Sequence, residues 1–275
     1  MWAKTTNNQQ TTTITVNKIE PYSSHKKNAL NIQPIHSAPA LLTTQLVDPD
    51  VSIIIPAYRE EETIAEVLQR VIKISWSLGN VEILVVDDGS TDNTAEKVAA
   101  FPFVKYIRHE RNFGKGAAIR TGIKNSRGKI LVIQDADLEY LPEHIPAIVK
   151  PILAGSTDMV YGSRFKDKPE GMSISHFIGN SILSLAARCL YNIQITDIMT
   201  GQKALKKSIL NSTELQENGF AVEIEITCKG FNSKQKFKEV PIPYSYRRHG
   251  ASKITYIDGL RSLVKLFTIF LREDT

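Results

Sequence analysis

Residues 51–56 read Val51-Ser-Ile-Ile-Ile-Pro56, a run rich in β-branched residues that ends at a proline. Such a run is typical of a strand that is buried on both faces of a parallel sheet. Further short apolar runs occupy 81–86, 104–107, 130–133 and 159–161, and residues 60–74 and 116–124 have helical periodicity. Strands that alternate with helices of this length predict an α/β fold, with helices on both faces of a mostly parallel sheet.

After residue 162 the alternation of strand and helix patterns becomes less regular. Residues 177–190 and 222–228 are expected to be helices, and residues 237–244, which contain two prolines, an edge strand. A final amphipathic helix carries its apolar side chains on one face: Leu260, Leu263, Val264, Phe267, Phe270 and Leu271. Residues 1–49 are polar, low in complexity and interrupted by prolines, so we expect a disordered tail before one domain at 50–275.

Length and composition indicate a globular protein, with 275 residues of which 42% are hydrophobic and 23% charged. The net charge of +5 favours an anionic partner, and nucleic acid, phosphorylated metabolites and an anionic membrane all qualify. Cys189 and Cys228 lie in apolar patterns, which indicates two reduced core thiols in a cytosolic protein. Neither a signal peptide nor an apolar stretch of about 20 residues is visible, so any work at a membrane is expected from its surface.

Two acidic segments follow predicted strands. Asp135-Ala-Asp137-Leu-Glu139 places three carboxylates at alternate positions, where they repel one another unless a cation lies among them. Such oxygens suit Mg²⁺ or Mn²⁺, although a solvated acidic turn is the simpler interpretation of this segment alone. Asp87-Asp-Gly-Ser90 ends a second strand at the same rim, which favours a metal or sugar-nucleotide site. Ser90 or Asp92 is also a candidate cap for the next helix.

Two other nucleotide-binding motifs are absent from the sequence. The first strand is followed by Pro56-Ala-Tyr-Arg-Glu60 instead of Gly-x-Gly-x-x-Gly, so no glycine loop can approach a dinucleotide pyrophosphate. Gly114-Lys-Gly116 does not complete a phosphate-binding P-loop either. It is expected to form a turn and a helix start, with Arg111 and Lys115 free to meet phosphate.

Nine motifs occur in order along the chain: VSIIIPAYRE (51–60), VVDDGSTD (85–92), NFGKG (112–116), DAD (135–137), GSRF (162–165), DIMTG (197–201), GFAVEIE (219–225), EVP (239–241) and RRHGASK (247–253). From about Val51 to its end, the chain thereby resembles the inverting family 2 glycosyltransferases of GT-A fold. The closer resemblance is to their dolichyl (polyprenyl) phosphate mannose synthase and glucosyltransferase branch.

The resemblance implies a nucleotide-sugar donor, linked to GDP or UDP. Asp135 is implied to position the donor sugar or ribose, and Asp137 and Glu139 to ligate Mg²⁺ or Mn²⁺. Glu139 stands where the mannose synthases often have glutamine, so its extra charge should tighten metal binding. The implied nucleotide-sugar site comprises Pro56, Tyr58, Glu60, Asp87, Asp88, Lys115, Asp135, Ala136 and Asp137.

The resemblance also implies an acceptor site. In this branch a basic residue and a serine one helical turn apart hold the acceptor phosphate, and His176 and Asn180 stand at the matching positions. Both donate hydrogen bonds but neither carries a permanent charge, and a polar residue at a helix start is an equal interpretation of His176. Arg164, Arg247 and Lys253 are implied to face the phosphates at the reacting centre, with a surface salt bridge as the alternative for Arg164.

The expected catalytic residues are Asp135, Arg164 and Asp197. Arg164 and the metal would stabilise negative charge on the leaving nucleoside diphosphate. A phosphate acceptor is ionised at neutral pH, whereas a hydroxyl acceptor needs a general base, for which Asp197 or else Glu223 is the candidate. Three functions stay open: transfer to polyprenyl phosphate, transfer to a hydroxyl of a saccharide or small molecule, and nucleotide-sugar binding without turnover. The carboxylate triad argues against the third.

The carboxyl-terminal part of the chain suggests contact with a membrane. Residues 229–253 hold seven basic residues against Glu239 alone, and the final helix has a broad apolar face with Arg261 and Lys265 on its polar side. Such a helix can lie in the headgroup layer of an anionic membrane, although burial in its own domain is the common alternative. We expect a peripheral protein at the cytoplasmic face of the membrane, with no nucleic-acid partner.

Overall fold

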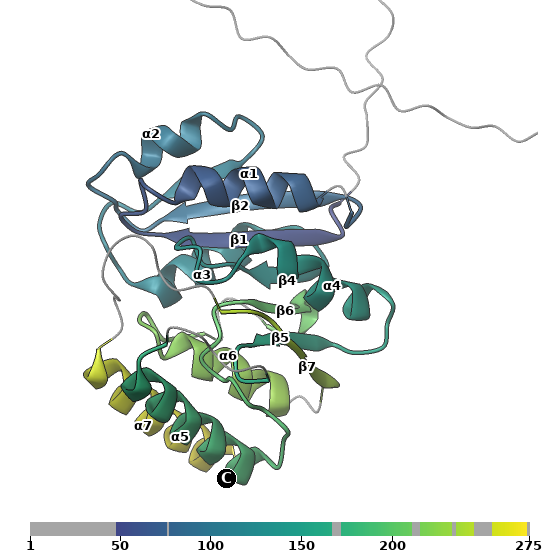
Figure 1. The fold of residues 1–275 in the computed structure, drawn as a ribbon, viewed down its shortest axis with the longest axis vertical. Coiled ribbons are helices and arrows are strands. Elements are labelled where there is room, and N and C mark those ends of the chain that lie inside the picture. The colour runs from purple at the N-terminus through teal and green to yellow at the C-terminus, as the bar shows by residue number, and fades with distance from the viewer. Residues whose placement is uncertain are drawn as a thin grey trace, which may run out of the picture. The chain divides into compact units, whose positions relative to one another are not determined.

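The computed structural model of the chain describes residues 48–75, 77–166, 172–210, 215–232, 235–244 and 255–273. Apart from residues 48 and 49, the predicted tail lies outside this part of the chain. The described residues form a seven-stranded sheet (Figure 1). In spatial order its strands are β3 Lys105–Arg108, β2 Val81–Asp87, β1 Val51–Ala57, β4 Ile130–Ile133, β6 Lys203–Lys206, β5 Met159–Ser163 and β7 Phe237–Pro241.

Most neighbouring strands are parallel, as the sequence predicts. β1 pairs in parallel with β2 and β4, β2 with β3, and β5 with β7, whereas β6 runs antiparallel between β4 and β5. The register sets Ala57 beside Asp87, so the polar residues that follow β1 and β2 emerge at one edge of the sheet. β7 lies at the end of the sheet, as predicted for residues 237–244.

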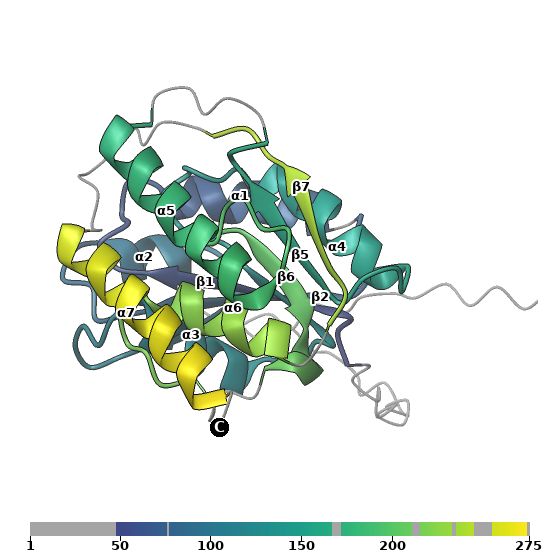
Figure 2. The same cartoon turned by 90° about the horizontal axis from the view of Figure 1, so that it is seen from below.

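Helices cover both faces of the sheet, and each face has its own apolar core (Figures 1 and 2). Ile53 and Ile55 face one core, which includes side chains of three helices: α1 Ile64–Ser75, α2 Thr94–Ala99 and α4 Ile145–Leu153. Ile54 faces the other core, with four helices: α3 Lys115–Asn125, α5 Ile174–Tyr191, α6 Val222–Asn232 and α7 Tyr256–Glu273. The predicted α/β arrangement is confirmed.

Some local features differ from the predictions. β6 is absent from the predicted strands because Lys203 and Lys206 bracket its two apolar residues. Helix α2 begins after Asn93, and the Ser90 hydroxyl accepts a hydrogen bond from the Arg59 amide instead of capping that helix. Asp92 is not the N-cap either, although its carboxylate accepts from the amide of Thr94.

Cys189 is exposed, so the prediction of two core thiols holds for Cys228 alone.

Helices α5 and α7 lie side by side in both views (Figures 1 and 2). Helix α7 packs inward through Leu266 and Ile269, which are buried. Lys265 also turns inward, because its ammonium lies 2.9 Å from Glu217 and 3.7 Å from Glu225. The polar side predicted for Lys265 therefore faces two carboxylates of the protein. None of the helices in the described residues is long and apolar enough to cross a membrane.

Candidate active site

A hollow of about 880 Å³ lies where β1, β2, β4 and β5 end, and α5 and α7 form its opposite wall. It gathers most of the predicted site residues, although they are far apart in the sequence. Those that line it are Pro56, Tyr58, Glu60, Asp88, Lys115, Asp135, Ala136, Asp137, Glu139, Arg164, His176 and Asn180. Arg247 and Lys253 lie outside the described residues.

Asp87 does not line the hollow, unlike its neighbour Asp88. The Asp87 side chain is buried, and it accepts hydrogen bonds from the Ser90 amide (2.8 Å) and the Tyr106 hydroxyl (2.5 Å). It therefore holds the turn after β2 in place. Its predicted contact with the nucleotide-sugar is not supported, because its oxygens point into the protein.

Asp88 orders the loop that leads into α3. Its carboxylate accepts hydrogen bonds from the amides of Phe113 (3.0 Å) and Gly114 (2.7 Å), and it lies 2.7 Å from His109 Nδ1. Gly114 has a φ of +104°, and a Cβ there would lie 2.3 Å from the Asn218 carbonyl oxygen. Glycine is therefore required where this loop passes residue 218. The loop fixes Lys115 at the first position of α3.

The acidic segment after β4 curves into the hollow. Leu138 has a φ of +61°, and the Glu139 amide donates to Asp137 Oδ1, which keeps the segment tightly folded. Burial raises the pKa of Asp135, and the nearby charges of Asp137 and Glu223 add to this rise, whereas the ammonium of Lys115 opposes it. Asp135 therefore lies among like charges in a buried setting, and a cation bound beside it would favour its ionised form.

The donor set fits a divalent metal that keeps part of its coordination for other ligands. Asp137 and Glu139 both line the hollow and supply hard carboxylate oxygens. No group of three or more His, Cys, Asp or Glu residues is placed to hold a metal within the described ranges. Mg²⁺ commonly completes its coordination with substrate phosphates and water, so two carboxylates suffice on the protein side.

A row of four alternating charges begins in this hollow and ends inside the protein. The Lys115 ammonium lies 2.7 Å from Asp135 Oδ1 and 2.9 Å from Glu223 Oε1. The other Glu223 oxygen accepts a hydrogen bond from Lys203 of β6. Although burial opposes it, the two lysines hold the pKa of Glu223 below its ordinary value. A carboxylate with a lowered pKa and two lysine partners accepts a proton poorly, so the alternative that Glu223 is a general base is not favoured.

Arg164 is held rigidly at the end of β5. Its Nε and one terminal nitrogen donate to the two oxygens of Asp197 at 2.7 and 2.8 Å, and its amide donates to Asp197 at 3.1 Å. The rings of Tyr140 and Phe165 lie 5.3 Å from the guanidinium carbon. Asp197 is fully buried and does not line the hollow, so its position does not favour the predicted role of general base for a hydroxyl acceptor. It orients Arg164.

Asn180 lines the hollow, and its side-chain amide is held from inside the protein. One N–H of its side chain donates to Asp197 Oδ1 at 3.0 Å, which fixes the orientation of the amide because a carboxylate only accepts. Its Oδ1 is buried and has no hydrogen-bond partner among the described residues. Asn180 therefore lies in the hollow, and its contact with an acceptor phosphate stays a prediction. His176 is exposed at the hollow.

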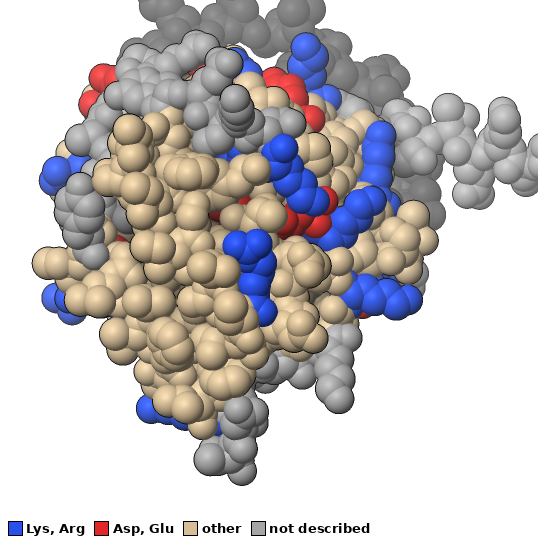
Figure 3. All heavy atoms as spheres, turned by 60° about the horizontal axis from the view of Figure 1, so that its bottom comes forward, with Lys and Arg blue, Asp and Glu red and all other residues tan. Residues whose placement is uncertain are grey.

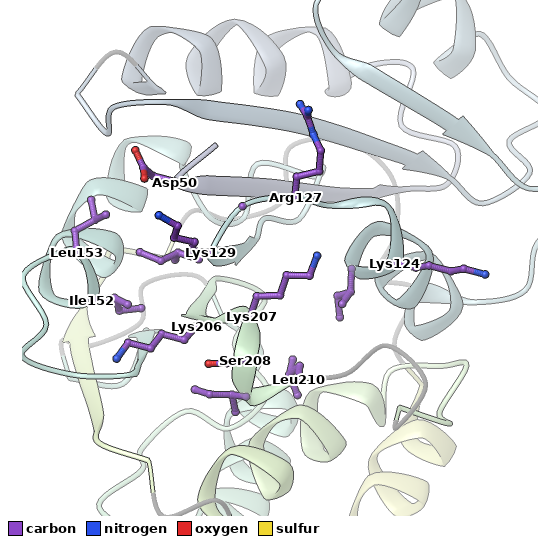
Figure 4. Close-up of a pocket in the computed structure, with 14 residues that line it drawn as sticks. Asp50, Lys124, Arg127, Lys129, Ile152, Leu153, Lys206, Lys207, Ser208 and Leu210 are labelled. Atoms are coloured by element: carbon purple, nitrogen blue, oxygen red, sulfur yellow. The ribbon is translucent and has the colours of Figure 1, made fainter. Parts of the chain in front are cut away.

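A second hollow, of about 920 Å³, lies at the other edge of the sheet, where β1 and β4 begin (Figure 4). Its basic side chains diverge: Lys124, Arg127 and Lys206 extend away from one another. Lys206 is paired with Asp158 at 2.6 Å, and Arg127 lies 3.4 Å from Glu82. The polar groups of this second hollow do not converge, whereas those of the first hollow do. We therefore take the first hollow as the functional site.

Comparison with known proteins identifies the family. Residues 52–213, more than half of the chain, match glycosyl transferase family 2. The dolichol-phosphate mannosyltransferase of Pyrococcus furiosus is 35% identical over 230 residues, which cover 78% of this chain and 63% of that protein. The UDP-N-acetylglucosamine–dolichyl-phosphate N-acetylglucosaminyltransferase of Methanococcus voltae is 29% identical, with 77% of this chain and 92% of that protein covered.

A solved structure has the same fold. The glucosyl-3-phosphoglycerate synthase of Mycobacterium tuberculosis, in complex with Mn²⁺, UDP-glucose and phosphoglyceric acid, superposes with a TM-score of 0.66. The match covers 81% of this chain and 80% of that one at 22% identity. Family match, relatives and fold agree: the chain belongs to glycosyl transferase family 2, and it is a glycosyltransferase with a GT-A-like fold.

Proposed function

We propose that the protein transfers a sugar from a GDP- or UDP-linked nucleotide-sugar to a polyprenyl (dolichyl) phosphate, with inversion at the anomeric carbon. The main observation behind this proposal is the position of the first hollow, because it adjoins an exposed apolar surface. The two curated relatives compared above are named for dolichyl-phosphate acceptors. The alternative of a nucleotide-sugar-binding protein without turnover does not agree with membership of this enzyme family.

Helices α5 and α7 both line the hollow and carry this apolar surface. Five large apolar side chains of each helix are exposed: Ile174, Phe177, Ile178, Ile182 and Leu185 on α5, and Ile257, Leu260, Val264, Phe267 and Leu271 on α7. Figure 3 shows a broad area of uncharged side chains on this side of the molecule. A surface of this size in a globular protein indicates a binding surface, and a lipid chain matches its chemistry.

The charged residues around this surface suit an anionic membrane. Arg188, Arg261 and Arg272 are exposed on the same two helices, and basic residues near an anionic surface contribute about 1 kcal/mol each. We place the protein at the cytoplasmic face of the membrane as a peripheral protein. The lipid chain would lie along α5 and α7 while its phosphate reaches the hollow, near His176 and the predicted Arg247 and Lys253.

On the donor side, Asp137 and Glu139 would hold Mg²⁺ or Mn²⁺, which when bound offsets negative charge on the nucleotide phosphates. Pro56, Tyr58, Glu60 and Asp88 would contact the base and ribose. Arg164, already oriented by Asp197, would stabilise charge on the leaving diphosphate. A phosphate oxygen of the acceptor forms the new bond to the anomeric carbon as the bond to the nucleotide breaks, so this chain need not supply a base.

Transfer to a hydroxyl is the second candidate, and Asn180 favours it. Its buried Oδ1 has no partner among the described residues, and a hydroxyl would satisfy it. A hydroxyl of the donor sugar satisfies it equally well. A hydroxyl acceptor needs a base, and the two predicted candidates are Asp197 and Glu223. Asp197 is paired with Arg164, and Glu223 is paired with two lysines, so neither is well placed to accept a proton.

A donor screen tests the proposal. The purified chain is incubated with labelled GDP- and UDP-sugars and with polyprenyl phosphate in detergent, with Mn²⁺ or with a chelator. We expect label in the lipid extract from one donor, and only with the metal. Label that appears as free sugar, or only in added soluble saccharides, would contradict a lipid-phosphate acceptor.

A further inference from the structure

Lys203 lies at the end of the row of charges that begins in the hollow, and no step proposed above uses it. It belongs to β6 and its side chain is fully buried. The ammonium donates to the carbonyl oxygens of Ile198 (3.2 Å) and Thr200 (2.6 Å) and to Glu223, and it lies 4.9 Å from the centre of the Tyr161 ring. Lysine is almost never buried without a partner, so its charge needs an explanation.

The explanation lies on the other side of Glu223. Glu223 is shared between two ammonium groups, Lys203 behind it and Lys115 in front of it. Lys115 is in turn shared between Glu223 and Asp135, at 2.9 and 2.7 Å. Lys203 does not line the hollow, whereas the other three do. Lys203 can therefore act on the donor only through its neighbours: the charged route runs through Glu223 and Lys115, and a second contact holds the carbonyls of Ile198 and Thr200 beside Met199.

Electrostatics in this buried site decide what Lys203 does. With both lysines present, Glu223 is neutralised from behind, and the Lys115 ammonium can remain close to Asp135. Without the charge of Lys203, the Glu223 carboxylate would draw Lys115 more strongly, because interactions between charges are strong where water is excluded. Asp135 would then lose part of its counter-charge beside Asp137, and its carboxylate would move.

We propose that Lys203 is a positioning residue of the donor site: it neutralises Glu223 from inside the protein, so that Lys115 holds Asp135 in place for the nucleotide-sugar. The proposal rests on the donor site described under Proposed function. It does not depend on the acceptor. A buried ion pair that merely stabilises the fold is the alternative, and it makes different predictions.

The test measures kcat/KM for the nucleotide-sugar in four variants, at a temperature where each is folded. Lys203→Met removes the charge and nearly keeps the volume. Lys203→Arg keeps the charge. Lys203→Met with Glu223→Gln removes both charges of the inner pair. Leu205→Ala, on the same strand and fully buried, destabilises the fold without changing charge.

We expect Lys203→Met to lower kcat/KM by about 10- to 100-fold, the range seen when a group that orients an active-site residue is lost. Lys203→Arg should recover most of this loss because it again pairs Glu223 with a positive charge. The double variant should recover it too, because the glutamine at position 223 carries no charge to neutralise. Leu205→Ala should stay near the wild type. Equal losses in Lys203→Met and Leu205→Ala at matched stability, or a folded double variant as slow as Lys203→Met, would overturn the proposal.

If Lys203→Met does not fold, Lys203→Gln replaces it, because glutamine is also uncharged but can donate to the carbonyl oxygens that Lys203 contacts. A loss of 10-fold or more in Lys203→Gln that the double variant recovers supports the proposal, whereas no loss, or a loss that the double variant keeps, overturns it. Nucleotide-sugar binding, measured by calorimetry, separates this test from the acceptor question. A wild-type chain that binds the donor but does not glycosylate polyprenyl phosphate contradicts the proposed function and leaves the Lys203 test in force.

Discussion

At the scale of single residues, Arg164 shows how a charged side chain is prepared for the reaction. Asp197 occupies one edge of its guanidinium, and the rings of Tyr140 and Phe165 limit its movement. Burial and these contacts leave the group little freedom to reorganise, which is the property that makes electrostatic stabilisation effective.

Arg164→Lys should lower kcat by about 100-fold or more with little change in donor affinity, because an ammonium cannot keep the two-point contact with Asp197. Steady-state kinetics at saturating acceptor measure the change. Arg70→Lys is the control, since Arg70 forms partly exposed ion pairs with Glu66 and Glu143 on the other face of the sheet. A loss confined to donor affinity would make Arg164 a binding residue only.

Asp137→Ala should abolish transfer and remove the Mn²⁺-dependent part of nucleotide binding, because one of two carboxylates available to the metal is lost. The thermal unfolding midpoint should change little, since Asp137 is only partly buried. Calorimetry of nucleotide binding with and without Mn²⁺ measures this, with the exposed Glu96→Ala of α2 as the control. Full turnover by the variant in excess chelator would refute the metal assignment.

Sequence patterns locate the site better than they assign its residues. The carboxylates of Asp135, Asp137 and Glu139 could be placed in the hollow because they directly follow a strand. The partners of Asp197 and Asn180 could not be predicted, because these contacts join positions 33 and 17 residues apart. That Lys203 is buried and paired with Glu223 is visible only in the three-dimensional structure.

At the scale of elements, most of the sheet could be predicted from runs of β-branched residues that recur between helical patterns. β6 is the exception, since its lysines are typical of a loop until Glu223 is seen to pair with Lys203. Helix α7 shows a different difficulty. Its periodicity predicts one apolar face, but the helix has two: one packs on the core through Leu266 and Ile269, and the other is exposed.

Binding of anionic vesicles should depend on the exposed faces of both α5 and α7. We expect the wild type to float with phosphatidylglycerol vesicles at low salt and less at high salt. Ile178→Glu with Val264→Glu should reduce flotation at either salt concentration, because these side chains are 51% and 58% exposed and would meet the membrane as charges.

Phe103→Glu with Leu153→Glu is the matched control, because it adds the same charge at exposed apolar residues on other parts of the chain. It should float like the wild type. Equal behaviour of the two double variants would mean that α5 and α7 do not form the membrane surface.

At the scale of the whole molecule, the hollow has two walls of different chemistry. The strand ends and the start of α3 supply carboxylates, Arg164 and Lys115, which suit a nucleotide-sugar and its metal. Helices α5 and α7 supply an apolar surface that ends at the same hollow. The two substrates would therefore meet at the boundary between a polar site and a lipid surface, without either having to enter the other's environment.

The central claim is that the nucleophile is a phosphate carried on a lipid, and a pair of acceptors that differ in that phosphate alone tests it most directly. The rate of transfer from one nucleotide-sugar is measured to a polyprenyl phosphate and to the polyprenol of the same length, in the same detergent with Mn²⁺. We predict rapid transfer to the phosphate and far slower transfer to the alcohol, because a phosphate is already ionised at neutral pH whereas an alcohol must lose a proton to react. Comparable transfer to polyprenol, or transfer to neither, would contradict the account.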